Sequence, residues 1–288
     1  MLYIKKKPIL IIDGSLYLYR AYYAFPQYID TTGNPTGAIY GMLKMLYTLL
    51  KKYNHTSNMI IIFDESKKTF RTTLFPDYKK NRPHMPKLLS IQIQPLIKKI
   101  KKIGIKTLSI PGIEADDIIG SLSHKLENAG EKVLIVSHDK DMLQLVTDNI
   151  YVLQKINYPI IKPDYIQKEY GINPKEFIDL LALMGDSSDN IPGVPKIGKK
   201  TALSLLHTFN NLENIYKNIE KIENLPIRNI KNIIQELKKN KKIAFLSYKL
   251  AKIQIHLDIQ ITIKDMIINH YYKKNFFYFF KKFYLENK

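Results

Sequence analysis

The chain has 288 residues, no cysteine, and a formal net charge of +19 from 45 Lys and Arg against 26 Asp and Glu. The lack of cysteine excludes disulfides, zinc–thiolate sites and cysteine nucleophiles, and no apolar run approaches the roughly 20 residues of a membrane-spanning helix. The positive charge predicts a nucleic-acid partner, although the Lys-, Ile-, Asn- and Tyr-rich composition is also typical of A·T-rich codon use. We expect a cytoplasmic protein without membrane contact.

Short apolar runs rich in Ile and Val predict five buried strands, at residues 8–13, 59–64, 105–110, 132–137 and 149–153. Helical patterns lie between them, at 36–53 and 114–128, and this alternation indicates a parallel α/β sheet flanked by helices. Ligands of such sheets bind beyond the carboxyl ends of the strands. Asp13 and Asp64 fall at such ends, and Asp139 follows two residues after another.

The segment 69–103 is too long for a simple strand-to-helix connection, and long insertions in compact domains are usually functional or disordered. It interleaves basic with aromatic residues, among them Arg71, Tyr78, Lys79, Lys80 and Arg82. This combination suits single-stranded nucleic acid, through attraction to the backbone and stacking on the bases.

Nine acidic residues carry the strongest chemical signal. They are Asp13, Asp64, Glu114, Asp116, Asp117, Asp139, Asp141, Asp186 and Asp189. One acid would be enough to cap the helix that begins near Glu114, whereas three acids in four residues repel one another unless a cation neutralises them. Taken alone, the Asp139–Asp141 pair also reads as a cap with a solvated acid, and 185–190 as an ordinary turn. Together, these oxygen ligands favour Mg²⁺ or Mn²⁺ over zinc.

Beyond about residue 170 the pattern is helical, at 173–184, 198–207, 227–238 and 241–252. We therefore expect an α/β domain at 1–170 and a helical DNA-binding domain at 171–288. The turn 193–201 nearly matches a phosphate-binding P-loop but has Lys200 at the Ser/Thr position and no preceding strand. A plain helical connection is the alternative to a phosphate grip by backbone N–H groups and lysines. The candidate contacts are Gly193, Lys196, Gly198, Lys199, Lys200 and Thr201.

These motifs, in this order, resemble the 5′-nuclease domain at the N-terminus of bacterial DNA polymerase I, a member of the flap endonuclease superfamily. The resemblance extends from about residue 9 to 285. It is carried by Ile12–Ala21, Phe63–Asp64, Tyr78–Pro83, Gly112–Asp117, Asp139–Asp141 and Leu181–Pro195. It departs from the family pattern at His138, where relatives usually carry glycine before the first acid of the pair.

The resemblance implies a two-metal nuclease that cuts DNA at 5′ ends and 5′ flaps, on nicked or branched duplex, and removes RNA primers from DNA. Two Mg²⁺ ions, replaceable by Mn²⁺, would activate the attacking water. Asp13, Asp64, Glu114 and Asp116 would hold the first ion, and the other five acids would complete that site and build the second. Residues 69–103 would form a helical arch, and 193–201 a helix–hairpin–helix-like element that binds K⁺.

By the same resemblance, Lys79 and Arg82 would stabilise charge on the scissile phosphate, and Tyr78 would stack on a terminal base. Arg20, Arg71 and Lys80 are further phosphate-contact candidates. We expect a free-standing monomeric nuclease that works beside a separate DNA polymerase. Two other interpretations stay open, a related metal-dependent ribonuclease and a non-catalytic protein that binds DNA structures.

Overall fold

A five-stranded parallel sheet in the order β3-β2-β1-β4-β5 lies at the centre of the chain. The computed structural model describes residues 7–54, 56–65 and 68–281. The strands are β1 (Ile9–Asp13), β2 (Met59–Ile62), β3 (Lys106–Leu108), β4 (Val133–Val136) and β5 (Ile150–Leu153). All five predicted runs form strands, and the predicted parallel α/β sheet is confirmed. β1, β2, β4 and β5 are buried on both faces, which explains their continuous Ile, Val and Leu.

The register aligns the carboxyl ends of the three central strands. Asp13 pairs with Ile62, the last residue of β2, and Ile12 pairs with Val136, the last residue of β4. The residues that follow these strands therefore come out at one edge of the sheet. The predicted strand end at Asp64 lies two residues beyond β2, at that same edge.

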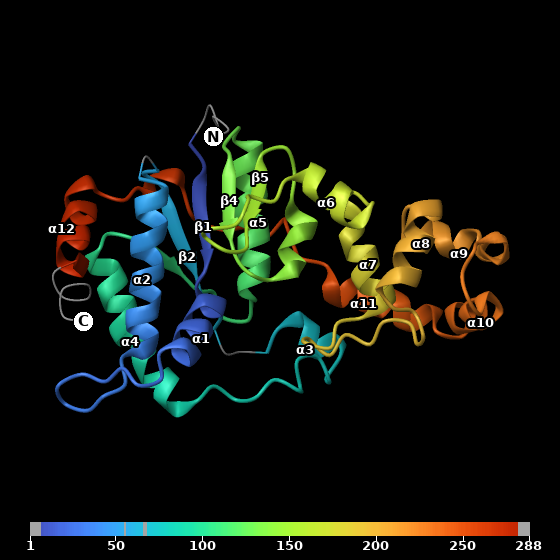
Figure 1. Cartoon of the computed structure of the whole chain (residues 1–288), viewed down its shortest axis with the longest axis horizontal. Helices are drawn as coiled ribbons and strands as arrows, with labels where there is room; N and C mark the ends of the chain where they lie inside the picture. Colours follow the sequence, from blue (N-terminus) through green and yellow to red (C-terminus); the bar gives the residue numbers. More distant parts are fainter. Residues whose placement is uncertain (1–6, 55, 66–67, 282–288) are drawn as a thin grey trace.

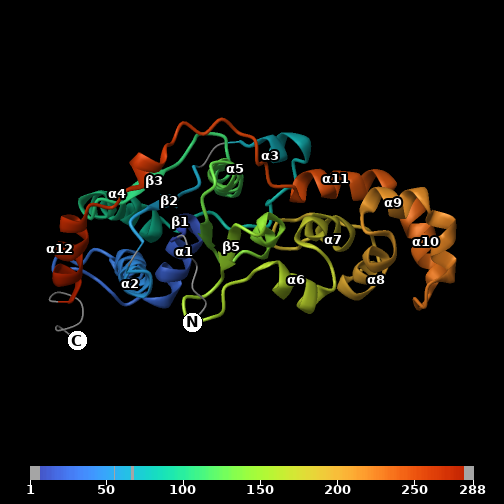
Figure 2. The ribbon, with the colours of Figure 1, turned by 90° about the horizontal axis from the view of Figure 1, so that it is seen from above.

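Helices cover both faces of the sheet (Figures 1 and 2). On one face the apolar core contains side chains of four helices, α1 (Gly14–Ala24), α2 (Gly37–Lys52), α4 (Lys87–Lys102) and α12 (His270–Phe280). On the other face it contains α5 (Ala115–Asn128) and continues into the helices after residue 162. These are α6 (Pro163–Tyr170), α7 (Phe177–Met184), α8 (Lys199–Phe209), α9 (Leu212–Lys217), α10 (Ile230–Lys239) and α11 (Lys241–Ala251).

Short elements complete the chain. They are α3 (Phe70–Leu74) and the 3-10 turns η1 (Lys140–Leu145), η2 (Pro174–Glu176), η3 (Ile219–Asn224) and η4 (Ile263–Met266). Among the described residues, no helix is both long and apolar enough to cross a membrane.

After α11 the chain returns to the sheet. In Figure 1, α12 packs beside α2 and α4, at the opposite end of the molecule from α9 and α10. Lys273 fixes this return, because its buried ammonium donates to the carbonyl of Asn54 at 2.5 Å. The last residues of the predicted helical domain, 282–288, lie outside the described part of the chain.

The structure corrects the extent of the predicted arch. Helix α4, its second half, packs on α2 through buried Leu89, Leu96 and Ile100. The amide oxygen of Gln92 also accepts from the N–H groups of Ala38 (2.9 Å) and Ile39 (3.4 Å), in the first turn of α2. Only the stretch before α4 runs across the carboxyl edge of the sheet, beside α3 (Figure 1).

Candidate functional site

Eight of the nine predicted acids gather where the central strands end. We call this set the acidic cluster: Asp13, Asp64, Glu114, Asp116, Asp139, Asp141, Asp186 and Asp189. The first four and Asp139 come from the ends of β1, β2 and β4 and from the start of α5. The other three come from η1 and from the turn after α7. Carboxylates far apart in sequence thus face one region, as expected for a parallel sheet.

Asp13 is fixed from two sides. Its Oδ1 accepts from the N–H of Leu16 at 3.0 Å, which caps α1, and its Oδ2 accepts from the Ser137 hydroxyl at 2.8 Å. Burial, with some repulsion from Asp64 and Asp139, raises the pKa of Asp13 to about 6. The carboxylate is therefore held in one orientation, and its ionised form is costly without a cation nearby.

Three other acids of the acidic cluster repel Asp116. Burial raises its pKa well above the usual value, Lys79 opposes this shift, and Asp139, Asp13 and Asp64 add to it. Neighbouring acids thus help to raise the pKa of both Asp116 and Asp13, which makes this a favourable environment for a positive ion.

Basic and aromatic side chains from the stretch after α3 reach into the cluster. The ammonium of Lys79 lies 2.5 Å from Glu114 and 3.5 Å from Asp189. The Tyr78 hydroxyl lies 3.1 Å from each of the same two carboxylates, and Arg82 pairs with Asp189. Burial works against the ionised form of Glu114, but nearby cations, Lys79 first, lower its pKa to about 2.

A second group lies around Asp141. Its N–H donates to Asp139 at 2.9 Å, while its own buried Oδ1 has no hydrogen-bond partner among the described residues. Burial, then repulsion from Asp139, Asp189 and Asp186, raises the pKa of Asp141 well above its usual value. Lys140 lies 3.1 Å from Asp186 and supplies part of the missing positive charge.

The donor set fits divalent ions that prefer oxygen. All eight candidate ligands are carboxylates, and the buried Asp141 oxygen without a hydrogen-bond partner among the described residues marks a place where positive charge is lacking. Within the described residues, no three acids or histidines converge closely enough to enclose an ion by themselves. That arrangement suits Mg²⁺, which usually keeps several water molecules and takes only one or two carboxylates directly.

Asp117 and Arg71 bind each other instead of metal and phosphate, which corrects both predictions. The two guanidinium Nη atoms of Arg71 contact the two carboxylate oxygens of Asp117 at 2.7 and 2.8 Å. The same guanidinium donates to the carbonyls of Leu250 (2.8 Å) and Lys252 (2.7 Å), at the end of α11. Both side chains are buried, so neither can reach a substrate.

Burial also decides what two further residues of the site, Tyr78 and His138, can contact. Tyr78 is only 5% exposed, so its ring cannot stack on a terminal base as predicted. His138, which departs from the glycine usual in relatives, packs against the ring of Tyr17 with a centroid distance of 5.4 Å. Burial, with a contribution from the positive charge of Arg20, lowers the pKa of His138 to about 4. Exposed Arg20 stays available to a phosphate.

The predicted phosphate turn is buried at Gly193, where it begins, and exposed at Gly198, where α8 starts. Gly193 is buried with φ +64°, and its N–H donates to the Ser247 hydroxyl at 3.0 Å, so it does not contact phosphate as predicted. A Cβ atom there would lie 2.3 Å from the backbone nitrogen of Gly185, so the turn requires glycine. Gly198 is the exposed N-cap of α8, with open space around it.

The lysines of this turn differ in the side chains that they contact. Lys196 lies 2.8 Å from Glu236, and Lys199 sits 4.2 Å above the centroid of the Tyr170 ring. Lys200 is exposed in the first turn of α8, followed by half-buried Thr201. Lys80, on the stretch after α3, has a side chain that is 73% exposed and pairs with Asp77 at 2.9 Å.

Sequence reasoning missed the hydroxyl groups that orient the acids. Ser137 bridges two elements, because it donates to Asp13 and accepts from the N–H of Asp139 at 3.1 Å. Ser15 accepts from the N–H of Asp64 at 2.7 Å, and Thr69 donates to Glu114 at 2.8 Å. The only available signal was their adjacency to the acids, which serine and threonine share with many ordinary turns.

Relief of repulsion gives a testable prediction for metal-free protein. Asp141→Asn should raise the free energy of unfolding in EDTA by on the order of 1 kcal/mol, because it removes a buried charge whose pKa is raised. An acid with a raised folded pKa stabilises the fold while protonated, and this contribution is lost as the pH rises. The gain in the variant should therefore be larger at pH 8 than at pH 4.

Urea denaturation at both pH values measures this effect. Asp148→Asn, at an exposed aspartate, is the matched control and should change stability little. If Asp141→Asn destabilises the metal-free protein at pH 8, the carboxylate is a structural partner and the crowding argument fails.

Comparison with known proteins adds sequence evidence. Two family models match, described as 5′-3′ exonuclease, N-terminal resolvase-like domain (residues 8–171) and 5′-3′ exonuclease, C-terminal SAM fold (172–274). A protein named 5′-3′ exonuclease from Buchnera aphidicola subsp. Acyrthosiphon pisum is 62% identical over 284 residues, 99% of each chain. The 5′-3′ exonuclease of Aquifex aeolicus is 41% identical over 264 residues, 91% of this chain and 87% of that one. DNA polymerase I of Pseudomonas aeruginosa is 39% identical over 260 residues, 90% of this chain but only 28% of the polymerase.

Solved structures show the same fold. The bacteriophage T5 D15 flap endonuclease, in a complex with DNA and metal ions, superimposes with a TM-score of 0.67 at 25% identity, over 85% of this chain and 88% of that one. The catalytic core of Rad2 in complex with DNA gives a TM-score of 0.62 at 17% identity, over 96% and 87% of the two chains.

Proposed function

This chain belongs to the 5′-3′ exonuclease family, and we propose that the acidic cluster is the centre at which it hydrolyses phosphodiester bonds of DNA. The resemblance inferred from the sequence is confirmed by these matches. The activity is that of a 5′-3′ exonuclease and flap endonuclease. The observation that carries the proposal is the meeting of eight carboxylates with Lys79 and Arg82 at the carboxyl edge of the sheet.

We assign divalent metal to the cluster, with Mg²⁺ as the ion and Mn²⁺ as its substitute. Asp13, Asp64, Asp116 and Asp139 would hold one ion, helped by Glu114, and Asp141, Asp186 and Asp189 would hold the other together with Asp139. When bound, such ions activate the attacking water and neutralise the leaving oxygen. Ser137 would keep Asp13 turned toward the ion through its 2.8 Å hydrogen bond.

Lys79 and Arg82 would bind the scissile phosphate. Both are charged and pair with carboxylates of the cluster, so they already lie within reach of any group that enters it. Burial alone would lower the pKa of Lys79, but Tyr78 and Glu114 hold it well above the usual value. The ammonium is therefore positive when a phosphate arrives, and it can exchange Glu114 for a phosphate oxygen.

The remaining contacts would grip the duplex. Gly198, Lys200 and Thr201 present the open start of α8, Lys196 and Lys199 flank it, and Arg20 and Lys80 are exposed near the cluster.

We propose K⁺ for the backbone carbonyls of the turn 193–198. We assign residues 1–170, together with Asp186 and Asp189, to the chemistry, and helices α8 to α11 to the duplex grip. The substrates would be 5′ flaps, nicked or branched duplex and RNA primers on DNA.

We also propose that the chain acts as a monomer, since one copy contributes every residue of the site. The Pseudomonas relative carries the matching sequence inside a DNA polymerase I. A DNA polymerase that displaces the 5′ strand is therefore the proposed working partner.

Cleavage of a 5′-labelled DNA flap tests this function. Wild-type protein should cut near the flap junction in Mg²⁺ and not in EDTA, and Asp116→Asn should abolish cutting while it preserves flap binding. An RNA hairpin of the same length is the second substrate, and preference for it would indicate a ribonuclease. Tight flap binding without cutting in Mg²⁺ or Mn²⁺ would instead indicate a non-catalytic binding protein.

A further inference from the structure

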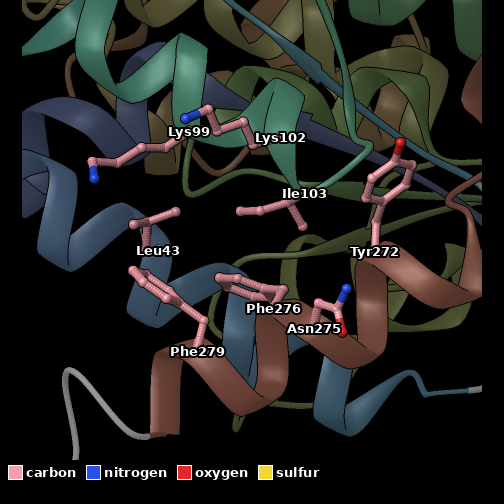
Figure 3. Close-up of a pocket in the computed structure, with 8 residues that line it drawn as sticks. All are labelled: Leu43, Lys99, Lys102, Ile103, Tyr272, Asn275, Phe276 and Phe279. Carbon is pink, nitrogen blue, oxygen red and sulfur yellow. The ribbon is translucent and has the colours of Figure 1, made fainter.

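A groove of about 280 Å³ lies between α4 and α12, at a place that the proposed chemistry does not use (Figure 3). Figure 3 shows the rings of Phe276 and Phe279 on the α12 side and the side chains of Lys99 and Lys102 on the α4 side. Phe276 is buried, whereas Phe279 is 42% exposed. The groove thus has one buried and one exposed aromatic ring on the α12 side and two lysine side chains on the α4 side.

Polar groups in the groove can recognise the edge of a planar ligand. Asn275 supplies an amide, and Tyr272, which is 46% exposed, supplies a hydroxyl at the end of a ring. None of the eight described residues that line the groove is acidic. The lining therefore favours an anionic ligand with a flat apolar face.

A second hollow lies beside the first. It is lined in part by Lys101, Gly104 and Lys106, and Asp265 is its one acidic lining residue. The carboxylate of Asp265 already accepts from the N–H and hydroxyl of Thr262, at 2.8 and 2.7 Å. The two hollows therefore present four lysines to an anionic chain.

Tyr272 marks the junction of the two hollows. It lines the first, and its ring lies against Gly104 of the second, where an added Cβ would come within 3.0 Å of the ring. A chain lying along both hollows would pass over an exposed tyrosine ring with lysines on either side. Aromatic rings combined with cationic side chains are typical of surfaces that bind single strands.

The groove is distinct from the acidic cluster. It lies at the C-terminal end of α4, and the stretch that carries Lys79 and Arg82 joins the N-terminal end of that helix. The 16 residues of α4 span roughly 24 Å at about 1.5 Å per residue. A strand could therefore occupy the groove without displacing a group at the cluster.

We propose that the α4–α12 groove binds single-stranded nucleic acid, with one base stacked against Tyr272, another against Phe279, and adjacent phosphates at Lys99 and Lys102. Charge complementarity and exposed rings favour this occupant. A folded protein partner would need a larger apolar surface than this small groove offers. The site would hold the unpaired strand away from the place of cutting, and it does not depend on the assignment of the acidic cluster.

Photocrosslinking tests the site directly. An oligodeoxythymidine that carries 5-iododeoxyuridine is irradiated with the full chain in EDTA, which prevents cleavage, and the crosslinked peptide is identified by mass spectrometry. We expect crosslinks at Tyr272 or Phe279. Crosslinks confined to residues near the acidic cluster would overturn the proposal.

Binding of the same oligonucleotide, followed by fluorescence anisotropy, supplies matched controls. Tyr272→Ala should weaken binding at least about fivefold, the lower end of what one stacked base contributes. Tyr272→Phe should keep most of the wild-type affinity, because it keeps the ring. Tyr278→Ala, at a 70% exposed ring of α12 outside the groove, should have less than about a twofold effect. Lys99→Ala should cost more than Lys98→Ala, which removes an exposed lysine of the same helix that does not line the groove.

Two results would overturn the inference. Equal losses in Tyr272→Ala and Tyr278→Ala would show that the groove has no special role. Equal competition by poly-glutamate and by unlabelled oligonucleotide would reduce the site to a general attraction for polyanions. Thermal melting of each variant shows whether its fold is intact, and the Tyr272→Phe result separates stacking from loss of structure.

Discussion

Lys79→Ala is expected to lower the turnover of a 5′-flap substrate by about 10²- to 10³-fold, the usual loss when one aligned donor to the developing charge is removed. Lys79 contacts Glu114 and Asp189 within the acidic cluster, and its side chain is only 21% exposed. The rest of the basic surface is unchanged in this variant. Duplex affinity should therefore stay within about threefold of wild type, since exposed lysines carry most of the non-specific attraction.

Lys80→Ala is the matched control. This neighbouring lysine is exposed and points to Asp77, away from the acidic cluster. Its removal should weaken binding slightly and in a salt-dependent way, with little change in single-turnover rate. Single-turnover cleavage at saturating enzyme measures the chemical step alone. A Lys79→Ala rate within twofold of wild type would remove Lys79 from the mechanism.

Arg71→Ala is expected to cost about 3–5 kcal/mol of folding free energy, which is typical when one partner of a buried ion pair is removed. Arg71 satisfies both oxygens of buried Asp117 and two carbonyls at the end of α11. Without the guanidinium, a carboxylate and two backbone acceptors remain buried without their donor. Urea denaturation should show a lower midpoint.

Arg71→Lys tests whether geometry or charge matters at this site. Lysine keeps the positive charge but cannot form the two-point contact with Asp117, so it should recover only part of the loss. The double variant Arg71→Met with Asp117→Leu should be more stable than Arg71→Ala, because no charge is left unpaired. A loss below about 1 kcal/mol in Arg71→Ala would contradict a clamping role.

Most of the sheet could be predicted because its signal is local. Runs such as Pro8–Asp13 and Lys132–Ser137 are apolar on both faces, turns bound them, and the carboxyl ends of parallel strands meet at one edge. The gathering of Asp13 with Asp116 and Asp139 then follows from topology, without any knowledge of distances.

The contacts and burial of individual charged side chains could not be predicted in this way. Arg71 and Asp117 are 46 residues apart, and Arg71 meets Leu250 across 179 residues. No local pattern distinguishes a buried arginine that clamps helices from an exposed one that binds phosphate. Tyr78 was misplaced for the same reason, because the burial of one ring depends on how α3 and the turn after α7 pack together.

The packing of α12 was also invisible in the sequence. Its aromatic residues suggested no position, since a ring-rich helix can bury itself against any apolar surface of the right shape. Only the completed fold shows that Phe276 and Phe280 fill the core beside α2 and α4. The same arrangement leaves Tyr272 and Phe279 partly open to solvent, and the α4–α12 groove depends on that contrast.

The return of α12 also sets an order of events during synthesis. Strands and helices of the N-terminal part leave the ribosome first, yet the face of α2 and α4 that α12 covers stays open until Phe276 and Phe280 emerge. More than one hundred residues separate β5 from α12. At about 5–20 residues per second, that face would stay open for roughly 5 to 25 s. The nascent chain thus carries an apolar surface that its own last helix, or a chaperone until then, must shield.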